Sequence, residues 1–158
     1  MGYAQSLQSP VMIVREGITA AGKDTSPSAN AATMKAANLP THALRLDPSW
    51  SNMEVSVVSD ADAQTGTLEI WGQRFDGDLI LIASITLVTG KAAATSGGLY
   101  VDTMVVTYYW PTEVKAIDNA GGDRQARVYF DTTGLKNAIF YLTAASAGTW
   151  GIKAAGIS

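Results

Sequence analysis

The stretch that decides the fold class is Glu69-Ile70-Trp71-Gly72-Gln73-Arg74-Phe75-Asp76-Gly77-Asp78-Leu79-Ile80-Leu81-Ile82. Two runs rich in apolar, aromatic and β-branched residues flank the pair Asp76-Gly77. An Asp-Gly pair adopts positive φ angles at little cost, and a tight hairpin turn requires such angles. The stretch therefore predicts two antiparallel strands that are joined at this turn.

The same pattern continues along the chain. From Thr41 onward, short β-branched and aromatic runs alternate with Gly, Asp, Asn and Pro, and this regular spacing is typical of an all-β sandwich or barrel. We expect strands over Val11–Arg15, Ala43–Asp47, Met53–Ser59, Thr67–Phe75, Leu79–Val88, Leu99–Trp110, Val114–Ile117, Gln125–Phe130, Ala138–Thr143 and Thr149–Ala154. The sequence thus predicts a single antiparallel β-sandwich or jelly-roll-like domain.

The sequence also predicts a second turn, one strand end and the burial of two strands. Ala120-Gly121-Gly122-Asp123 predicts a second turn, and Pro111 is expected to end a strand because proline has no N–H for the sheet. Alternate residues of Gln125–Phe130 are apolar, which indicates a strand with one buried face. Leu79–Val88 is apolar almost throughout, so we expect it to lie centrally with both faces covered.

The N-terminal region differs in composition from the rest. Residues 1–40 are expected to form one strand followed by an extended arm, and residues 41–158 the sandwich. Between Gly17 and Leu39 the chain is dominated by Ala, Ser, Thr and Asn and has no strong apolar period. This segment is either a long flexible loop, because such a composition cannot build its own core, or an arm that becomes ordered against a neighbouring subunit.

Composition excludes several classes of function. The chain has 158 residues, of which 47% are hydrophobic and 16% charged, against about 25% charged in an average soluble domain. Its surface must therefore be rich in small neutral residues, which suits contact with other proteins. A net charge of −3 argues against nucleic-acid binding through phosphate contacts. Without cysteine, and with one histidine, the chain has no disulfide, no thiolate nucleophile and no multi-histidine metal site.

Candidate catalytic residues are few. His42, the single imidazole, would need an activated hydroxyl and an orienting carboxylate to act as a base, and the chain contains no G-x-S-x-G motif. A surface or loop histidine is the simpler interpretation. A glycosidase would need two converging carboxylates, for which Glu54, Glu69, Glu113 and Asp131 are the candidates. Their spacing in sequence does not indicate which of them converge.

Motifs for ions and nucleotides are incomplete. Asp60-Ala61-Asp62-Ala63-Gln64-Thr65-Gly66 begins like a calcium loop, but position twelve lacks the required glutamate, so an Asp-rich turn is the simpler interpretation. Gly90-Lys91 resembles the end of a P-loop without its upstream glycine or its Ser/Thr. We therefore predict no catalytic residues, no cofactor, no metal, and a protein that is not an enzyme.

The aromatic residues leave a binding function open. Trp50, Trp71, Trp110 and Trp150, together with six tyrosines, could form a platform for stacking sugars. A carbohydrate-binding module would expose at least two of these tryptophans on one face. The alternative is that they are anchors of the core or of an interface.

No targeting or membrane segment is expected. Met1–Val14 lacks the basic region of a signal peptide. The longest uncharged stretch, Asn137–Ile152, is shorter than a membrane-spanning helix and contains two glycines. Met1–Ser6 fits the loose myristoylation pattern, but no basic cluster follows it to hold a singly acylated protein on a membrane.

Three strings carry a resemblance to a known group of proteins. They are Leu68–Arg74 with its Asp-Gly turn and Leu79–Val88, Gly97-Gly98-Leu99-Tyr100-Val101-Asp102-Thr103, and Arg127–Gly134 followed by Phe140-Tyr141-Leu142. The region from Val55 to Leu142 resembles small virion structural proteins of tailed bacteriophages. The resemblance implies a β-sandwich without an enzymatic site that is present in many copies in the particle.

The resemblance further implies a location and partners. The expected role is that of a capsid decoration, or cement, protein that bridges shell subunits through its sandwich faces and N-terminal arm. Its partners would be the major capsid protein or other virion proteins, and it would be a homo-oligomer, with a trimer favoured. The alternatives are a neck, tail or fibre component of the virion, a carbohydrate-binding module, and, in last place, a small hydrolase with a carboxylate pair.

Overall fold

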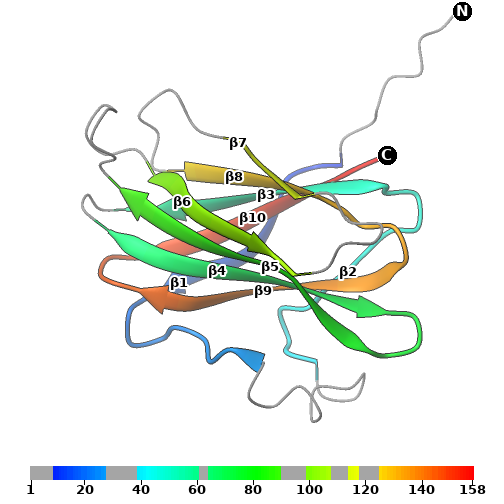
Figure 1. Ribbon diagram of the computed structural model, residues 1–158, viewed down its shortest axis with the longest axis horizontal. Helices are drawn as coiled ribbons and strands as arrows, with labels where there is room; N and C mark the ends of the chain where they lie inside the picture. The colour runs from blue at the N-terminus through cyan, green and yellow to red at the C-terminus, as the bar shows by residue number, and fades with distance from the viewer. Residues whose placement is uncertain (1–8, 28–38, 61–63, 90–98, 108–113, 118–124) are drawn as a thin grey trace, which may run out of the picture.

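Two five-stranded antiparallel sheets packed face to face form the protein (Figure 1). The structure is a computed structural model that describes residues 9–27, 39–60, 64–89, 99–107, 114–117 and 125–158. Nearly all of its regular structure is β-strand, so the predicted all-β sandwich is confirmed.

Each sheet draws its strands from distant parts of the chain. Sheet A has the order β1 (Met12–Ile18), β10 (Trp150–Ile157), β3 (Asn52–Ser59), β8 (Gln125–Asp131) and β7 (Val114–Ile117). Sheet B has the order β2 (Leu44–Arg45), β9 (Leu135–Ala145), β4 (Thr65–Arg74), β5 (Leu79–Thr89) and β6 (Leu99–Val106). When β6 and β7 are set aside, the orders 1-10-3-8 and 2-9-4-5 are those of a jelly roll, with β6 and β7 added as one extra strand per sheet.

The hairpin that decided the fold class forms as the sequence predicts. β4 and β5 pair along their length, and the amide of Gly77 donates to the carbonyl of Arg74 at 3.0 Å to close the turn. Gly77 has a φ of +94°, which glycine adopts without the steric cost of a β-carbon. The prediction of a turn at Asp76-Gly77 is thus confirmed.

The core lies between the sheets and follows the predicted alternation. In β8, Ala126, Val128 and Phe130 are buried, whereas the residues between them are only partly buried. β8 pairs in register with β3, whose Met53, Val55 and Val57 are fully buried. The prediction of a half-buried strand over Gln125–Phe130 is therefore confirmed.

β5 departs from the expectation that both of its faces are covered. It lies between β4 and β6, and the outer faces of its two halves are covered to different extents. In the first half, Leu79 and Leu81 pack on an apolar cluster on the outer face of sheet B. In the second half, Ser84 and Thr86 alternate with buried residues and are only half-buried, so the expectation is wrong there.

Strand ends also differ from the predicted bounds. The expected strand over Ala43–Asp47 contains only the two residues of β2, because the carboxylate of Asp47 accepts bonds from the amide and hydroxyl of Ser49 and starts a turn. β6 ends at Val106, whereas the sequence suggested Trp110. The predicted turn at 120–123 and the predicted strand end at Pro111 lie outside the described residues.

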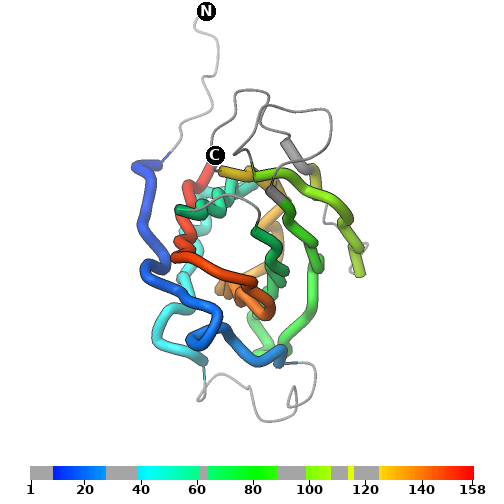
Figure 2. The backbone as a smooth tube through the Cα atoms, turned by 90° about the vertical axis from the view of Figure 1, so that its left-hand side faces the viewer, coloured from blue at the N-terminus to red at the C-terminus, as the bar shows by residue number. Residues whose placement is uncertain are grey.

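The N-terminal region begins within the sandwich. β1 is the edge strand of sheet A and pairs with β10, with register shifts on either side of Arg15. After β1, the chain turns at Thr19–Gly22 and crosses to the edge of sheet B, where the amide of Asp24 donates to the carbonyl of Leu142 at 2.8 Å. Figure 2 shows this segment running along the outside of the sandwich. It connects the two sheets on one side of the molecule.

Candidate functional site

The two carboxylates predicted on strands do not form a catalytic pair. Glu54 lies on β3 of sheet A, and its side chain is 4.0 Å from that of Arg127 on β8. Glu69 lies on β4 of sheet B, where its Oε2 atom accepts bonds from Ser26 and Trp71. Both point away from the core, on opposite outer faces of the sandwich, so the whole thickness of the domain separates them. The arrangement that a glycosidase needs is absent for this pair.

The other two candidate acids do not change this result. Asp131 ends β8, and its carboxylate accepts a bond from the amide of Thr133 at 2.7 Å, so it stabilises the turn into β9. Glu113 lies outside the described residues. Glu54 and Asp131 are diagonal neighbours on the outer face of sheet A, because Asp131 pairs with Asn52, two positions before Glu54 on β3. Each makes a different contact, Glu54 with Arg127 and Asp131 with Thr133.

The candidate calcium loop is described only at its two ends, where its side chains make contacts within the protein. The carboxylate of Asp60 accepts a bond from the amide of Thr149 at 2.8 Å, and the hydroxyl of Ser59 donates to the side-chain carbonyl of the buried Gln64. Asp62, like Gly90 and Lys91, lies outside the described residues. Within the described ranges no three His, Asp or Glu side chains are grouped so that they could hold a metal ion.

The described tryptophans all pack in or against apolar clusters of the protein. Trp150 is 1% exposed and Trp71 is 5% exposed. Trp50 is half-buried and packs against the core, with its ring close to Gly156. Trp110 lies outside the described residues. These three tryptophans lie at separate places in the fold and form no exposed platform for sugars.

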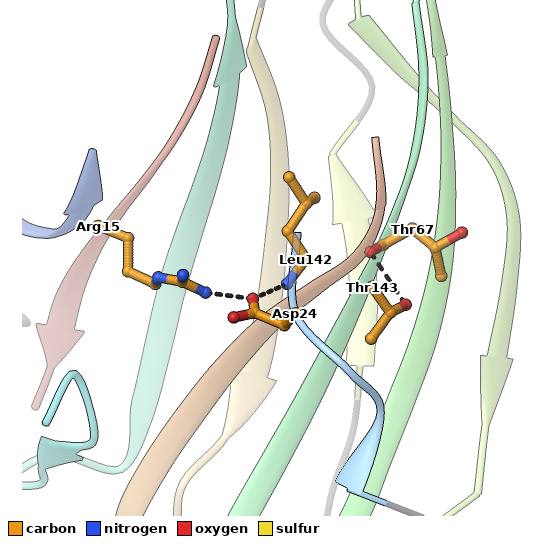
Figure 3. Close-up of polar contacts among 5 residues, drawn as sticks. All are labelled: Arg15, Asp24, Thr67, Leu142 and Thr143. Atoms are coloured by element: carbon orange, nitrogen blue, oxygen red, sulfur yellow. Dashed lines mark hydrogen bonds and ion pairs between the residues drawn. The ribbon is translucent and has the colours of Figure 1, made fainter. Parts of the chain in front are cut away.

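The structure instead assembles polar residues where the N-terminal segment meets sheet B. Asp24 forms an ion pair with Arg15 of β1, and its Oδ2 atom accepts a bond from the amide of Leu142 at 2.8 Å (Figure 3). Because the amide of Asp24 also donates to Leu142, this residue occupies the open edge of β9 as a strand residue would. We call these contacts of Asp24 with Arg15 and Leu142 the arm latch.

A β-bulge lies beside the arm latch. The register between β4 and β9 shifts after Thr67, which leaves Thr143 as the extra residue. The hydroxyl of Thr143 faces the carbonyl of Thr67 at 3.5 Å (Figure 3). Bulges increase the local twist of a strand. The bulge lies directly beside Leu142, whose backbone takes part in the arm latch.

A second polar contact holds the same segment over the outer face of sheet B. The hydroxyl of Ser26 donates to Oε2 of Glu69 at 2.9 Å, and the indole N–H of Trp71 donates to the same atom at 2.9 Å. Trp71 belongs to an apolar cluster on this face together with Ile139 and Tyr141. The segment from Thr19 to Ser26 is thus held against the protein's own sandwich.

His42 lies next to this assembly and has the surroundings of a structural residue. Its ring meets the ring of Tyr141 edge-on, with centroids 5.6 Å apart and planes at 80°. Burial lowers the pKa of His42, the Arg15 guanidinium lowers it further, and the Asp24 carboxylate partly opposes both. No hydroxyl group bonds to its ring among the described residues, so no catalytic triad is formed there.

The pKa of Tyr141, in the same surroundings, shifts in the opposite direction from that of His42. Burial raises the pKa of the Tyr141 hydroxyl to about 12, with the negative charges of Asp24 and Glu69 adding to the rise and Arg15 opposing it. The hydroxyl therefore stays protonated at neutral pH. It is a poor proton acceptor for catalysis and a stable part of the outer face.

Sequence reasoning missed Arg15 and Asp24. Each lies beside an oppositely charged residue in a segment without a motif, and the two side chains become neighbours only because β1 and β9 lie at the same side of the sandwich. The acid next to Lys23, in a segment otherwise rich in small neutral residues, was the one available signal. It does not indicate which backbone edge the acid will meet.

The arm latch leads to a testable expectation. Replacing Asp24 with Ala removes a charged acceptor from Leu142 and leaves Arg15 unpaired at a site where both side chains are mostly buried. We expect the free energy of unfolding to fall by about 1–2 kcal/mol. Urea denaturation of the two proteins measures this difference.

The matched control is Lys23→Ala, which removes the neighbouring charge from an exposed position in the same segment. We expect this variant to match the unchanged protein. Equal losses in the two variants would show that Asp24 does not stabilise the segment through its specific contacts.

Four large apolar side chains remain exposed in the described part of the chain. Val11 and Ile13 are 62% and 61% exposed at the start of β1, and Val105 is 54% exposed near the end of β6. Phe75, at the tip of the β4–β5 hairpin, is 71% exposed. Three of the four therefore lie on or beside an edge strand of a sheet.

Comparisons with known proteins assign no family to the chain. No protein-family model matches the chain, and no curated protein matches it. Among solved structures it is similar to the crystal structure of the SPBc2 prophage-derived protein YomS, with a TM-score of 0.47 and 8% sequence identity, over 100% of this chain and 99% of that chain. Similarity of this degree transfers no function.

A membrane-spanning helix is not found in the described ranges, where no helix has the length and hydropathy needed to cross a bilayer.

Proposed function

We propose that the protein is a non-enzymatic structural component of a bacteriophage virion, in the role of a capsid decoration, or cement, protein. It would act by contact, with its edge strands and sheet faces bridging shell subunits. The partners would be the major capsid protein or other virion proteins, and a second copy of the chain, with a trimer as the favoured state. A neck, tail or fibre position is the alternative within the same class.

The observation that carries the proposal is the position of the exposed apolar side chains. Val11 and Ile13 lie at the edge of sheet A, and Val105 lies at the edge of sheet B. In the described residues, β1 pairs only with β10 and β6 only with β5. An edge strand offers backbone donors and acceptors, and exposed apolar residues beside it favour the addition of another chain.

Four further points support a contact function. The carboxylates Glu54 and Glu69 lie on opposite faces, and the three described tryptophans form no sugar platform, so the described residues offer little support for either rival function. The chain has only 16% charged residues, which lowers the cost of removing its surface from water. The jelly-roll architecture also occurs in viral capsid domains, although it occurs in lectins as well. The sequence resemblance of Val55 to Leu142 points to the same class.

A direct test is sedimentation of the native source lysate on a density gradient, followed by mass spectrometry for this chain. Under the proposal, the protein sediments with particles of megadalton mass. Its abundance relative to the major shell protein then separates decoration, with many copies, from a neck or fibre position with few. A protein that stays at the top of the gradient as a small species would contradict the proposal.

The edge-strand contact has its own test. Replacing Ile13 with Asp places a charge at the edge of sheet A without changing the core, and we expect attachment to particles to weaken by about tenfold or more. Phe75→Asp is the matched control, because Phe75 is also exposed (71%, against 61% for Ile13) but lies on a hairpin tip and not on a sheet edge. Attachment that is lost in Phe75→Asp and kept in Ile13→Asp would place the contact elsewhere.

A further inference from the structure

We propose that the arm latch is sensitive to pH and that protonation of His42 opens it on mild acidification. Opening would release the segment that carries Asp24 from the edge of β9 and from the outer face of sheet B. This inference rests on the contacts around His42 and does not depend on the proposed function.

The geometry around His42 favours the neutral ring. Its Nε2 atom is buried and has no hydrogen-bond partner among the described residues. One side of the ring is in edge-on contact with Tyr141, which directly precedes the latch residue Leu142 on β9. A proton added at Nε2 would create a buried donor and a buried charge without an acceptor, which is unfavourable in such a place.

Charged and titratable groups from four elements face this site. Arg15 comes from β1, Asp24 from the segment after β1, Tyr141 from β9 and Glu69 from β4. Arg15 and Asp24 neutralise each other while the latch is closed. A protonated His42 would add one positive charge beside the Arg15 guanidinium, and it would compete with Arg15 for the Asp24 carboxylate. Both effects weaken the closed latch.

The direction of the pH effect follows from linkage. Because burial and Arg15 lower the pKa of His42 below its ordinary value of 6.5, the open state binds a proton before the closed state does. The closed state keeps its full stability above pH 6.5 and loses it as the pH falls from 6.5 through the lowered value. The chain has one histidine, and free carboxylates titrate at about pH 4. The loss of stability just below pH 6.5 is therefore assigned to His42.

Opening of the latch has a structural consequence. The N–H and C=O of Leu142, which both bond to Asp24, would become available to solvent or to another strand. The bond between Ser26 and Glu69 would be lost with the same segment, whereas Glu69 would keep its bond from the indole N–H of Trp71. The edge of β9 and the outer cluster of Trp71 and Tyr141 would thus become more accessible.

The test is amide hydrogen exchange of the full chain, with the amide of Leu142 as the reporter because it donates to Asp24 in the closed latch. Protection, corrected for the intrinsic pH dependence of exchange, is expected to fall between about pH 7 and pH 5 by up to about tenfold per pH unit. The amide of Val55, on the central part of sheet A, reports global unfolding and should keep its protection.

Two variants decide whether His42 is responsible. In His42→Gln and His42→Phe, the protection of Leu142 is expected to be independent of pH over the same range. The inference is overturned if Leu142 protection in the unchanged protein does not vary with pH. It is also overturned if both variants keep the same pH dependence, or if Val55 loses protection in parallel with Leu142.

Discussion

Replacing Trp150 with Ala is expected to lower the free energy of unfolding by about 4 kcal/mol, the largest effect that we predict for a single substitution. Trp150 is 1% exposed at the start of β10, and its indole N–H donates to the carbonyl of Ala147 at 2.9 Å. Its ring lies against Gly66 of β4, so close that a β-carbon at Gly66 would be 2.8 Å from it. Removing the ring would therefore leave a cavity between the two sheets.

Urea denaturation monitored by circular dichroism measures this loss. The matched control is Phe75→Ala, which removes an aromatic ring that is 71% exposed and should change stability little. Similar effects of the two substitutions would mean that Trp150 does not link the two sheets as described.

Replacing Gly156 with Ala is expected to lower the free energy of unfolding by about 3 kcal/mol. A β-carbon at Gly156 would overlap the Trp50 ring at Cδ2, Cε2 and Cε3. The ring cannot move away easily, because Trp50 packs against the core. The backbone of Gly156 is also fixed, since its amide donates to the hydroxyl of Ser9 and its carbonyl accepts from the amide of Ser9.

A double-mutant cycle separates this clash from any intrinsic cost of alanine in the strand. We expect Trp50→Ala to be destabilising alone, but Gly156→Ala to cost little when it is added to Trp50→Ala. Thermal unfolding of the four proteins provides the cycle. If Gly156→Ala costs the same in both backgrounds, the Trp50 ring is not what limits space at this position.

Part of the fold could be read from the sequence because its determinants are local. The pair Asp76-Gly77 fixes a turn through the freedom of Gly77 to adopt a positive φ. The alternation in Gln125–Phe130 marks the buried face, because successive side chains of a strand point to opposite sides. Both were predicted correctly from a few neighbouring residues.

The second half of β5 shows where local reading fails. Thr86 and Val88 look like parts of a buried run, yet they are half-buried, because the described residues do not fully cover the outer face of sheet B beside them. The bulge at Ile82 also shifts the alternation within the strand. Coverage of a face depends on which segments pack over it, and that is a property of the whole chain.

The candidate site was predicted only in its parts. His42, Glu69 and Trp71 were singled out as a possible base, a possible acid and a possible sugar contact. The structure brings them close to one outer face, where they take part in the attachment of the N-terminal segment. Asp24, which makes the central contact, has no motif around it and was not singled out.

The sequence by itself determined the all-β class, the positions of most strands and the exclusion of cysteine and multi-histidine chemistry. These properties depend on composition, on period-two alternation and on turn residues, all of which act over a few residues. Only the tertiary structure decided the jelly-roll order of the strands, the separation of Glu54 from Glu69 and the meeting of Arg15, Asp24 and Leu142. Those contacts join residues that lie up to 118 positions apart, and they form only when the packing of two sheets brings distant segments to the same edge.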